Sequence, residues 1–294
     1  MMKNPLPRVA AIHDICGYGR CSLTVVIPIL STMGFEVCPL PTAVLSTHTL
    51  FPNFVIMDMT DELPKIIRHW QEMDLKFDAI YSGFLGSARQ VDIVCDFIRS
   101  FQGPDTLVVV DPVMADHGKL YPTMVPEMVG EMKKLSRISR VITPNLTEAA
   151  FMLGRVTPEV ISEKEAKEWL KNLTDLGPEM AVITSAPLVS RSNAATVIGY
   201  DRVDERFWIT DRPFVPAQYH GTGDIFASVL TGSLLQGDSL PVAMDRSAQF
   251  VATTIRATFG YRERTLGHHH EVLLERALNT LTTPVKNTTY ELLS

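Results

Sequence analysis

Short apolar runs alternate with amphipathic stretches along most of the chain. Most of these runs are continuous rather than alternating, which is typical of strands buried on both faces of a sheet. The pattern predicts an α/β fold with a mainly parallel central sheet, helices on both faces and a small β flap, in one domain over residues 1–294. The expected strands are 8–14, 36–41, 78–83, 105–113, 139–145 and 179–186, followed by a hairpin within 194–210. The expected helices are 22–34, 60–76, 87–101, 123–136, 147–154, 163–173, 224–236, 239–259 and 270–280.

Polar residues follow the predicted strands at the ends where ligands bind in open α/β sheets. Because the carboxyl ends of parallel strands meet at one edge, we expect these side chains to form a polar rim on an apolar sheet. Such a rim is what a small-molecule site needs. Its members are His13 and Asp14, Ser82 to Phe84, Asp111 to Val113, Thr143 to Asn145, and Thr184 and Ser185.

Composition narrows the class of protein. A hydrophobic fraction of 46% and a charged fraction of 20% over 294 residues indicate a soluble globular protein with a substantial core. A net charge of −6 argues against a nucleic-acid partner, and no apolar run is long enough to span a membrane. The start of the chain has no secretory pattern. The four cysteines, Cys16, Cys21, Cys38 and Cys95, form no CxxC pair and no spacing typical of zinc sites, so we expect reduced thiols in the cytoplasm.

Two glycine-containing segments are similar to known phosphate-binding loops, but each lacks a residue that the loop motif requires. The segment GYGRCS (17–22) follows a predicted strand, but Ser22 replaces the third glycine of a dinucleotide fingerprint. Glu36, the candidate ribose carboxylate, falls at the start of the next strand rather than at its end. We interpret this segment as a flexible substrate loop. The dipeptide Gly118-Lys119 lacks the earlier glycine of a P-loop, so another segment must bind any phosphate group.

The segment GTGD (221–224) is the candidate phosphate-binding segment. Gly221, Thr222 and Gly223 stand before a helix pattern, where glycine lets a ligand approach the main chain closely. The free N–H groups and the dipole at a helix start favour an anion there. Asp224 has two interpretations: an ordinary helix cap, or a general base that faces a substrate hydroxyl while the GTG amides hold the transferring phosphoryl group.

Two further carboxylates also have alternative interpretations. Asp111 ends a buried strand, so it is either hydrogen-bonded to nearby backbone or close to a cation such as Mg²⁺. Asn145 and Glu148 are three residues apart at a predicted helix start, where they complete a capping box or present both side chains to a ligand. The run of three histidines at 268–270 is adjacent to Glu271, and we interpret it as a solvated helix start rather than a metal site.

Taken together, GTGD at 221–224, DPVM at 111–114 and TPNLTEA at 143–149 resemble the ribokinase-like superfamily. LSTHT at 45–49 and YSGFLGS at 81–87 resemble its vitamin B6 kinase branch, and the likeness runs from about residue 8 to about residue 260. The resemblance implies a three-layer α/β/α fold and an ATP-dependent kinase for a heteroaromatic alcohol. It also implies that Mg²⁺ is required, that a monovalent cation is a candidate for a further cofactor, and that the protein forms a homodimer.

The resemblance also assigns roles to matching positions. Asp224 is implied as the catalytic base, with Gly221, Thr222 and Gly223 as the anion hole; Glu148 with Asn145, together with Asp111, is implied to organise Mg²⁺ and phosphate. The implied nucleotide-side residues are Asp111, Asp116, Tyr121, Thr143, Asn145, Thr184 and Thr222. The implied substrate residues are Thr49 and Phe84, with Asp14 or His13 in place of a family serine that hydrogen-bonds the ring.

Three functions stay open at this point. The first is phosphorylation of the 5′-hydroxyl of pyridoxal, pyridoxamine or pyridoxine. The second is a hydroxymethylpyrimidine or phosphomethylpyrimidine kinase, which performs the same chemistry on another ring; those kinases also have an aspartate near the position of Asp14. The third is a catalytically silent ligand-binding protein, against which the intact GTGD segment counts. A sugar kinase is disfavoured because the hydroxyl-rich N-terminal sugar pattern is not evident.

Overall fold

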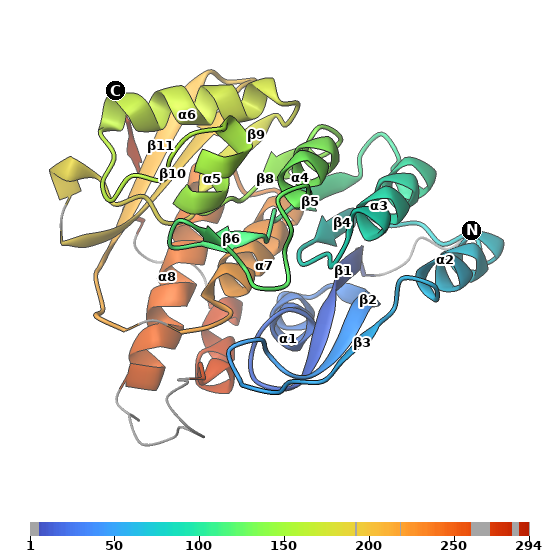
Figure 1. The fold of residues 1–294 in the computed structure, drawn as a ribbon. Coiled ribbons are helices and arrows are strands. Elements are labelled where there is room, and N and C mark those ends of the chain that lie inside the picture. The colour runs from blue at the N-terminus through green and yellow to red at the C-terminus, as the bar shows by residue number, and fades with distance from the viewer. Residues whose placement is uncertain (1–5, 192, 218, 260–270, 284–287, 294) are drawn as a thin grey trace.

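The computed structural model describes residues 6–191, 193–217, 219–259, 271–283 and 288–293. Its main sheet has ten strands in the order β12-β11-β10-β9-β8-β5-β4-β1-β2-β3, and its six central strands, from β9 to β2, are parallel (Figure 1). The parallel strands are β1 (Arg8–Tyr18), β2 (Glu36–Thr47), β4 (Ala79–Ser82), β5 (Leu107–Val110), β8 (Val141–Ile142) and β9 (Met180–Ile183). The antiparallel edges are β3 (Ile56–Asp58), β10 (Ala194–Asp201), β11 (Arg206–Pro213) and β12 (Glu291–Leu292).

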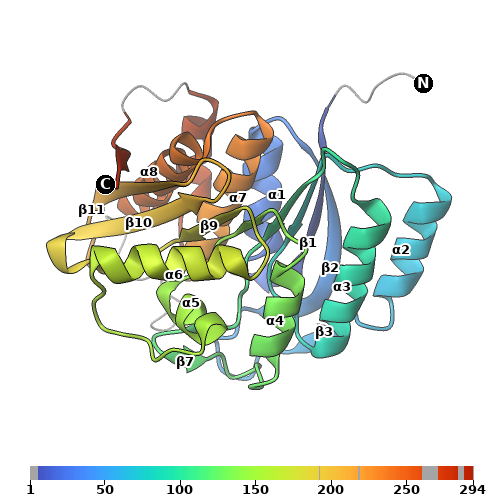
Figure 2. The same cartoon turned by 90° about the horizontal axis from the view of Figure 1, so that it is seen from above.

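Helices cover both faces of this sheet (Figure 2). One face carries α2 (Leu63–Glu72), α3 (Ala88–Phe101), α4 (Met128–Ser136), α5 (Leu146–Leu153) and α6 (Glu163–Asp175). The other carries α1 (Leu23–Thr32), α7 (Thr222–Leu235) and α8 (Leu240–Phe259). Strand side chains point alternately to the two faces, so Ala10 and Ile12 of β1 join the first core cluster while Val9 and Ala11 join the second. The predicted three-layer α/β/α fold is therefore confirmed.

The predicted hairpin within 194–210 forms β10 and β11, and these strands extend the main sheet. A separate two-stranded sheet, β6 (Ala115–Asp116) and β7 (Lys119–Leu120), is the small β flap. Its turn places His117 and Gly118 at φ values of 50° and 74°. No helix within the described residues is long and apolar enough to cross a bilayer.

The predicted helix at 270–280 is wrong. The chain there forms two short 3-10 helices, η2 (Leu274–Arg276) and η3 (Leu278–Thr282). Its inward residues Leu274 and Ala277 are buried and lie three positions apart, a spacing that fits the tighter 3-10 turn. The histidine run at 268–270 lies outside the described residues, but Glu271 is not a solvated helix start, because its carboxylate lies 2.5 Å from Nε2 of buried His48.

Candidate active site

One cavity of about 880 Å³ lies at the carboxyl ends of the parallel strands, a volume typical of a small-molecule site. Its walls come from the ends of β1, β5, β8 and β9, the start of α7, and the β6–β7 flap. Every residue to which the family resemblance assigns a role lines it except His13. Of the wider predicted rim, Ser82, Gly83, Pro112 and Pro144 do not line it either. The lining therefore includes Asp14, Thr49, Phe84, Asp111, Asp116, Tyr121, Thr143, Asn145, Glu148, Thr184, Gly221, Thr222, Gly223 and Asp224.

His13 does not belong to the cavity wall. Its ring is 0% exposed and packs edge-on against Tyr81, with ring centroids 4.4 Å apart. A Cβ atom on Gly83 would lie 2.3 Å from Nδ1 of His13, so the histidine fills the space that this glycine leaves open. Burial lowers the pKa of His13 to about 3, which keeps the ring neutral. The structure thus leaves Asp14 alone at the position where the sequence suggested Asp14 or His13.

Helix α7 begins with its N-terminus exposed to the cavity. Gly221 is the N-cap residue in a left-handed conformation (φ 79°), and no side chain caps the helix. A Cβ atom on Gly221 would lie 2.1 Å from the carbonyl oxygen of Arg20, so only glycine allows the helix to start against this backbone. A Cβ atom on Gly223, in contrast, would meet nothing within 4 Å. The first N–H groups of α7 are therefore available to an anion in the cavity.

The Asp224 carboxylate does not cap its own helix. Its Oδ2 accepts a hydrogen bond of 2.9 Å from the backbone N–H of Ser22, in the loop between β1 and α1. Burial raises the pKa of Asp224 from 3.8 to about 7; the Ser22 hydrogen bond opposes this rise, and the negative charge of Asp14 adds to it. A carboxylate with a pKa near 7 suits a general base at neutral pH.

Asp111 follows β5 and is 5% exposed. Burial and the nearby charge of Asp224 raise its pKa, while the Thr143 hydroxyl has the opposite effect. No lysine or arginine within the described part of the chain forms an ion pair with Asp111, so its ionised form lacks a protein cation. A carboxylate in this position suits a cation that arrives with the substrate.

The capping-box interpretation of Asn145 and Glu148 is correct. The Asn145 side chain accepts from the Glu148 N–H, and Glu148 Oε2 accepts from the Asn145 N–H, both at 2.9 Å. Glu148 Oε1 also accepts a 3.1 Å hydrogen bond from the Met114 N–H, which ties the segment after Asp111 to α5. Both oxygens of this buried carboxylate therefore accept hydrogen bonds from backbone N–H groups.

The flap that carries Asp116 and Tyr121 is fastened to the start of α5. The Asn145 amide donates to the Ala115 carbonyl at 2.8 Å, and the Gly118 N–H donates to the Thr147 hydroxyl at 3.0 Å. These bonds hold the flap beside the strand-end residues Asp111 and Thr143, which line the same cavity.

Sequence reasoning missed Ser22 and His48, which line the cavity, and Glu271, which contacts His48. Ser22 holds Asp224 through a backbone N–H, which no side-chain pattern reveals, although its rare φ of 50° marks the loop. His48 is 1% exposed, contacts Glu271, and has its ring centroid 4.4 Å from that of His220. Glu271 also accepts from the Arg20 N–H at 2.9 Å. These contacts join the 17–22 segment to residues more than 200 positions away, a distance at which local sequence gives no signal.

The comparisons with known proteins agree with this geometry. The family model described as phosphomethylpyrimidine kinase matches residues 55–271. A Bacteroides thetaiotaomicron protein described as a phosphomethylpyrimidine kinase, in a crystal form with pyridoxal, has 50% sequence identity and a TM-score of 0.93, over 98% of this chain and 100% of its own. Pyridoxal kinase from Lactobacillus plantarum has 27% identity and a TM-score of 0.85, over 94% and 96%. Human pyridoxal kinase is 30% identical over 221 residues, 68% of this chain and 69% of its own.

The protein is a kinase of the ribokinase-like superfamily. Its three-layer α/β/α fold has a mainly parallel sheet, and a buried carboxylate lies beside an uncapped helix start that faces the cavity. The chain belongs to the phosphomethylpyrimidine kinase family, in the branch that contains the pyridoxal kinases.

Proposed function

We propose that the protein transfers the γ-phosphoryl group of ATP to the 5′-hydroxymethyl group of pyridoxal, pyridoxamine or pyridoxine. The observation that carries this proposal is the pairing of the Asp224 carboxylate with the uncapped start of α7 in one cavity. The relative that is 50% identical over nearly the whole chain, in a crystal form with pyridoxal, supports the choice of substrate.

In this mechanism, Asp224 accepts the proton of the substrate hydroxyl as the oxygen attacks the γ-phosphorus. The N–H groups at the start of α7 stabilise the negative charge of the transferring group. The Ser22 N–H fixes the orientation of the carboxylate, leaving its other oxygen for the hydroxyl. Phe84, in the cavity wall, offers an apolar face on which the pyridine ring stacks, worth on the order of 1 kcal/mol beyond area burial.

Mg²⁺ fits the residues on the nucleotide side of the cavity. Mg²⁺ binds through one or two carboxylates together with substrate phosphates and retained waters. Asp111 supplies a buried carboxylate, and the buried Thr143 hydroxyl lines the same cavity. Glu148 contributes through water, because its oxygens already hold backbone N–H groups. The bound ion would offset the negative charge of the ATP phosphates. A monovalent cation belongs to the same proposal, tested by comparing rates in potassium and tetramethylammonium salts.

The second candidate is a hydroxymethylpyrimidine or phosphomethylpyrimidine kinase. The description of the matching family model and the carboxylate of Asp14 in the cavity wall favour it. The deciding experiment measures kcat/KM for the three B6 vitamers and for hydroxymethylpyrimidine under the same ATP and Mg²⁺ conditions. We expect a vitamer to be preferred. A preference for the pyrimidine of about tenfold, or 1.4 kcal/mol in transition-state binding, would overturn the proposal. Turnover of none of the four would support a silent binding protein.

We also propose that the protein acts as a homodimer in the cytoplasm. An apolar edge of the sheet supports the dimer. Ile56 and Met57 of β3 are 46% and 63% exposed, Val55 directly before β3 is 68% exposed, and Val44 of β2 is 40% exposed. Exposed apolar clusters of this kind mark protein interfaces. Light scattering after size-exclusion chromatography should give twice the 32.7 kDa of one chain, and Ile56→Asp should reduce it to one. A wild-type mass of one chain would contradict the dimer.

A further inference from the structure

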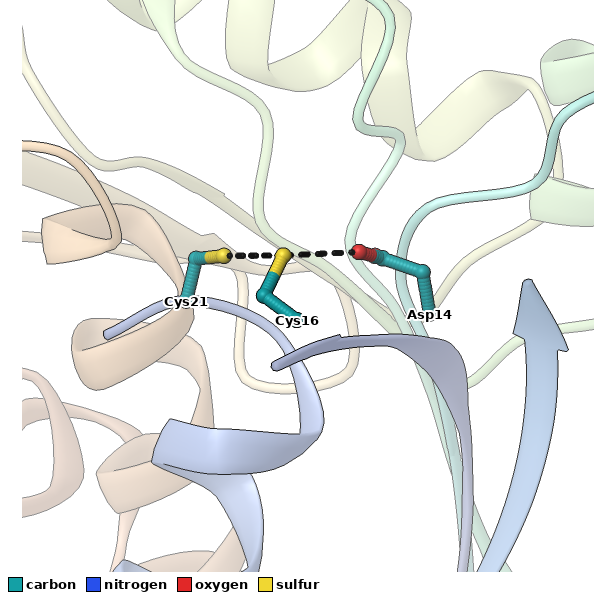
Figure 3. Close-up of side chains that lie close together, drawn as sticks. All are labelled: Asp14, Cys16 and Cys21. Atoms are coloured by element: carbon teal, nitrogen blue, oxygen red, sulfur yellow. Dashed lines mark hydrogen bonds between the residues drawn. The ribbon is translucent and has the colours of Figure 1, made fainter. Parts of the chain in front are cut away.

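Three side chains with metal-binding atoms meet in the cavity wall near the end of β1 (Figure 3). The Sγ atoms of Cys16 and Cys21 are 3.1 Å apart, and Cys16 Sγ lies 3.6 Å from Asp14 Oδ2. The ligand atoms of all three residues lie within 4.8 Å of one another. Asp14, Cys16 and Cys21 are 5%, 2% and 3% exposed, and all three line the cavity.

The local chain path explains this meeting. Asp14 and Cys16 are two residues apart on β1, where the register with β2 is irregular between His13 and Ile15. Their side chains meet there, with Cys16 Sγ 3.6 Å from Asp14 Oδ2. An antiparallel bridge between Ile15 and Ser22 then folds the chain back on itself. Cys16 and Cys21 are the next pair inside this narrow loop, and four residues separate them. Four intervening residues are the upper limit for a pair of zinc-binding cysteines, so the spacing alone does not indicate a site. The fold changes this interpretation because it adds a carboxylate as a third ligand.

Asp14 forms no ion pair with an arginine, lysine or histidine in the described ranges. Burial raises the pKa of Asp14, and hydrogen bonds with Ser22 and Cys16 oppose this rise. Cys21 also has a raised pKa, because of its hydrogen bond with Cys16, its burial, and the negative charges of Asp224 and Asp14. A divalent cation would replace the thiol protons and neutralise the carboxylate, which relieves the cost of burying these groups together.

We propose that Asp14, Cys16 and Cys21 bind one thiophilic divalent cation, of which Zn²⁺ is the type, with a fourth coordination position open to the cavity. Two thiolates at Zn–S distances of about 2.3 Å in tetrahedral geometry lie roughly 3.8 Å apart, so the pair at 3.1 Å must separate by less than 1 Å. The 3.6 Å between Cys16 Sγ and Asp14 Oδ2 already suits a shared tetrahedral ion.

The position of this site predicts its effect on the kinase, a consequence that rests on the proposed function. Ser22 directly follows Cys21 and donates its N–H to Asp224, and Asp14 lines the substrate side of the cavity. A cation bound by the three residues would therefore occupy space that the heteroaromatic ring needs. Its positive charge would also make the Asp224 carboxylate a weaker base. We expect Zn²⁺ to inhibit in competition with the alcohol substrate and not with ATP.

The test uses the full chain, freed of metal and kept reduced with a phosphine, with four free thiols verified before titration. Zn²⁺ is titrated by calorimetry in buffers of different ionisation enthalpy, which reports released protons, and Co²⁺ is titrated while its visible spectrum is recorded. We expect one ion per chain, proton release, and a thiolate-to-cobalt charge-transfer band. Binding without the band, or no binding at micromolar ion, would overturn the proposal.

Variants locate the ion. Cys16→Ser, Cys21→Ser and Asp14→Asn should each lower Zn²⁺ affinity by more than the roughly 10–100-fold that loss of an outer-shell partner costs. Cys38→Ser is the matched control, because Cys38 is a free cysteine on β2 outside the cluster, and it should bind as wild type. Circular dichroism verifies folding, and Asp14→Asn retains a test if a cysteine variant fails to fold. Equal loss in Cys38→Ser, or wild-type affinity in the three ligand variants, would contradict the site.

The two proposals fail separately. If the protein binds Zn²⁺ through these residues but phosphorylates no vitamer, the metal site stands and the proposed function falls. If the protein is an active kinase and Zn²⁺ does not bind at the cluster, the metal site falls and the proposed function stands.

Discussion

At the scale of single residues, the proposed chemistry depends on carboxylates whose pKa values are raised by burial. The sequence identified Asp224 and Asp111 because strand ends and helix starts are recognisable locally, and both line the cavity. It misplaced His13, because which of two adjacent side chains faces the core depends on the sheet register and on the space beside Gly83. It could not find Ser22, whose contribution is a backbone N–H.

The raised pKa of Asp224 predicts the pH dependence of activity. A general base works in its ionised form, so kcat/KM should rise with pH through about 7 and then level off. Asp224→Asn should lose this rising limb. Rates measured from pH 5.5 to 9 with a saturating nucleotide test this, and a wild-type profile that is flat across pH 6–8 would contradict the assignment.

The same pKa affects the free energy of unfolding in a defined direction. The unfolded chain loses this proton near pH 3.8 and the folded protein near pH 7. The stability contributed by the protonated group is therefore complete below about pH 4 and is lost as pH rises to about 7. The melting temperature of Asp224→Asn, relative to wild type, should increase over this range. A difference that is constant with pH would show that Asp224 ionises normally in the folded state.

At the scale of elements, two helix starts hold the site in different ways. Helix α7 begins without a side-chain cap, while α5 begins with a complete capping box. The sequence predicted both starts, because glycine, asparagine and glutamate at fixed spacings are strong local signals. The helix expected at 270–280 failed, since packing against the rest of the molecule, rather than local propensity, determines the conformation of η2 and η3.

Gly221 and Gly223 should respond differently to alanine. Gly223→Ala meets open space, so its melting temperature should stay within a few degrees of wild type, but its methyl group would stand beside the N–H groups of α7. We expect its kcat/KM to fall by roughly 10²-fold or more, as when one donor to a developing charge is lost. Gly221→Ala should also lower the melting temperature, because its Cβ atom would clash with the Arg20 carbonyl. Normal activity in Gly223→Ala would show that no anion binds there.

Glu148→Gln separates metal organisation from capping. We expect the Mg²⁺ concentration for half-maximal rate to rise by roughly tenfold, the low end of the cost of losing an outer-shell partner. Glu165→Gln is the matched control, because Glu165 completes an equivalent capping box at the exposed start of α6. It should show only a small loss of stability due to the weakened cap, with a normal Mg²⁺ response. If Glu148→Gln is destabilised but keeps a normal Mg²⁺ response, its role is capping alone.

At the scale of the whole molecule, the sheet explains both the core and the site. Continuous apolar strands predicted burial on two faces, and alternating side chains of those strands divide the core into two clusters. The short edge strands β3 and β12 were not predicted, because two or three residues carry no periodicity and their pairing depends on distant segments. The cavity lies at the carboxyl ends of the parallel strands, which is where the sequence predicted a rim of polar residues.

The most direct test of the account is kcat for phosphorylation of pyridoxal by wild type and by Asp224→Asn, with substrate binding and melting temperature measured on both. Asparagine preserves the shape of Asp224 and an oxygen to accept the Ser22 N–H. We predict that kcat falls by roughly 10²- to 10⁴-fold while the Kd values for pyridoxal and ATP change little, because the lost interaction acts in the transition state. A variant that keeps more than about a third of the wild-type kcat, a loss smaller than any general-base contribution, would contradict the account.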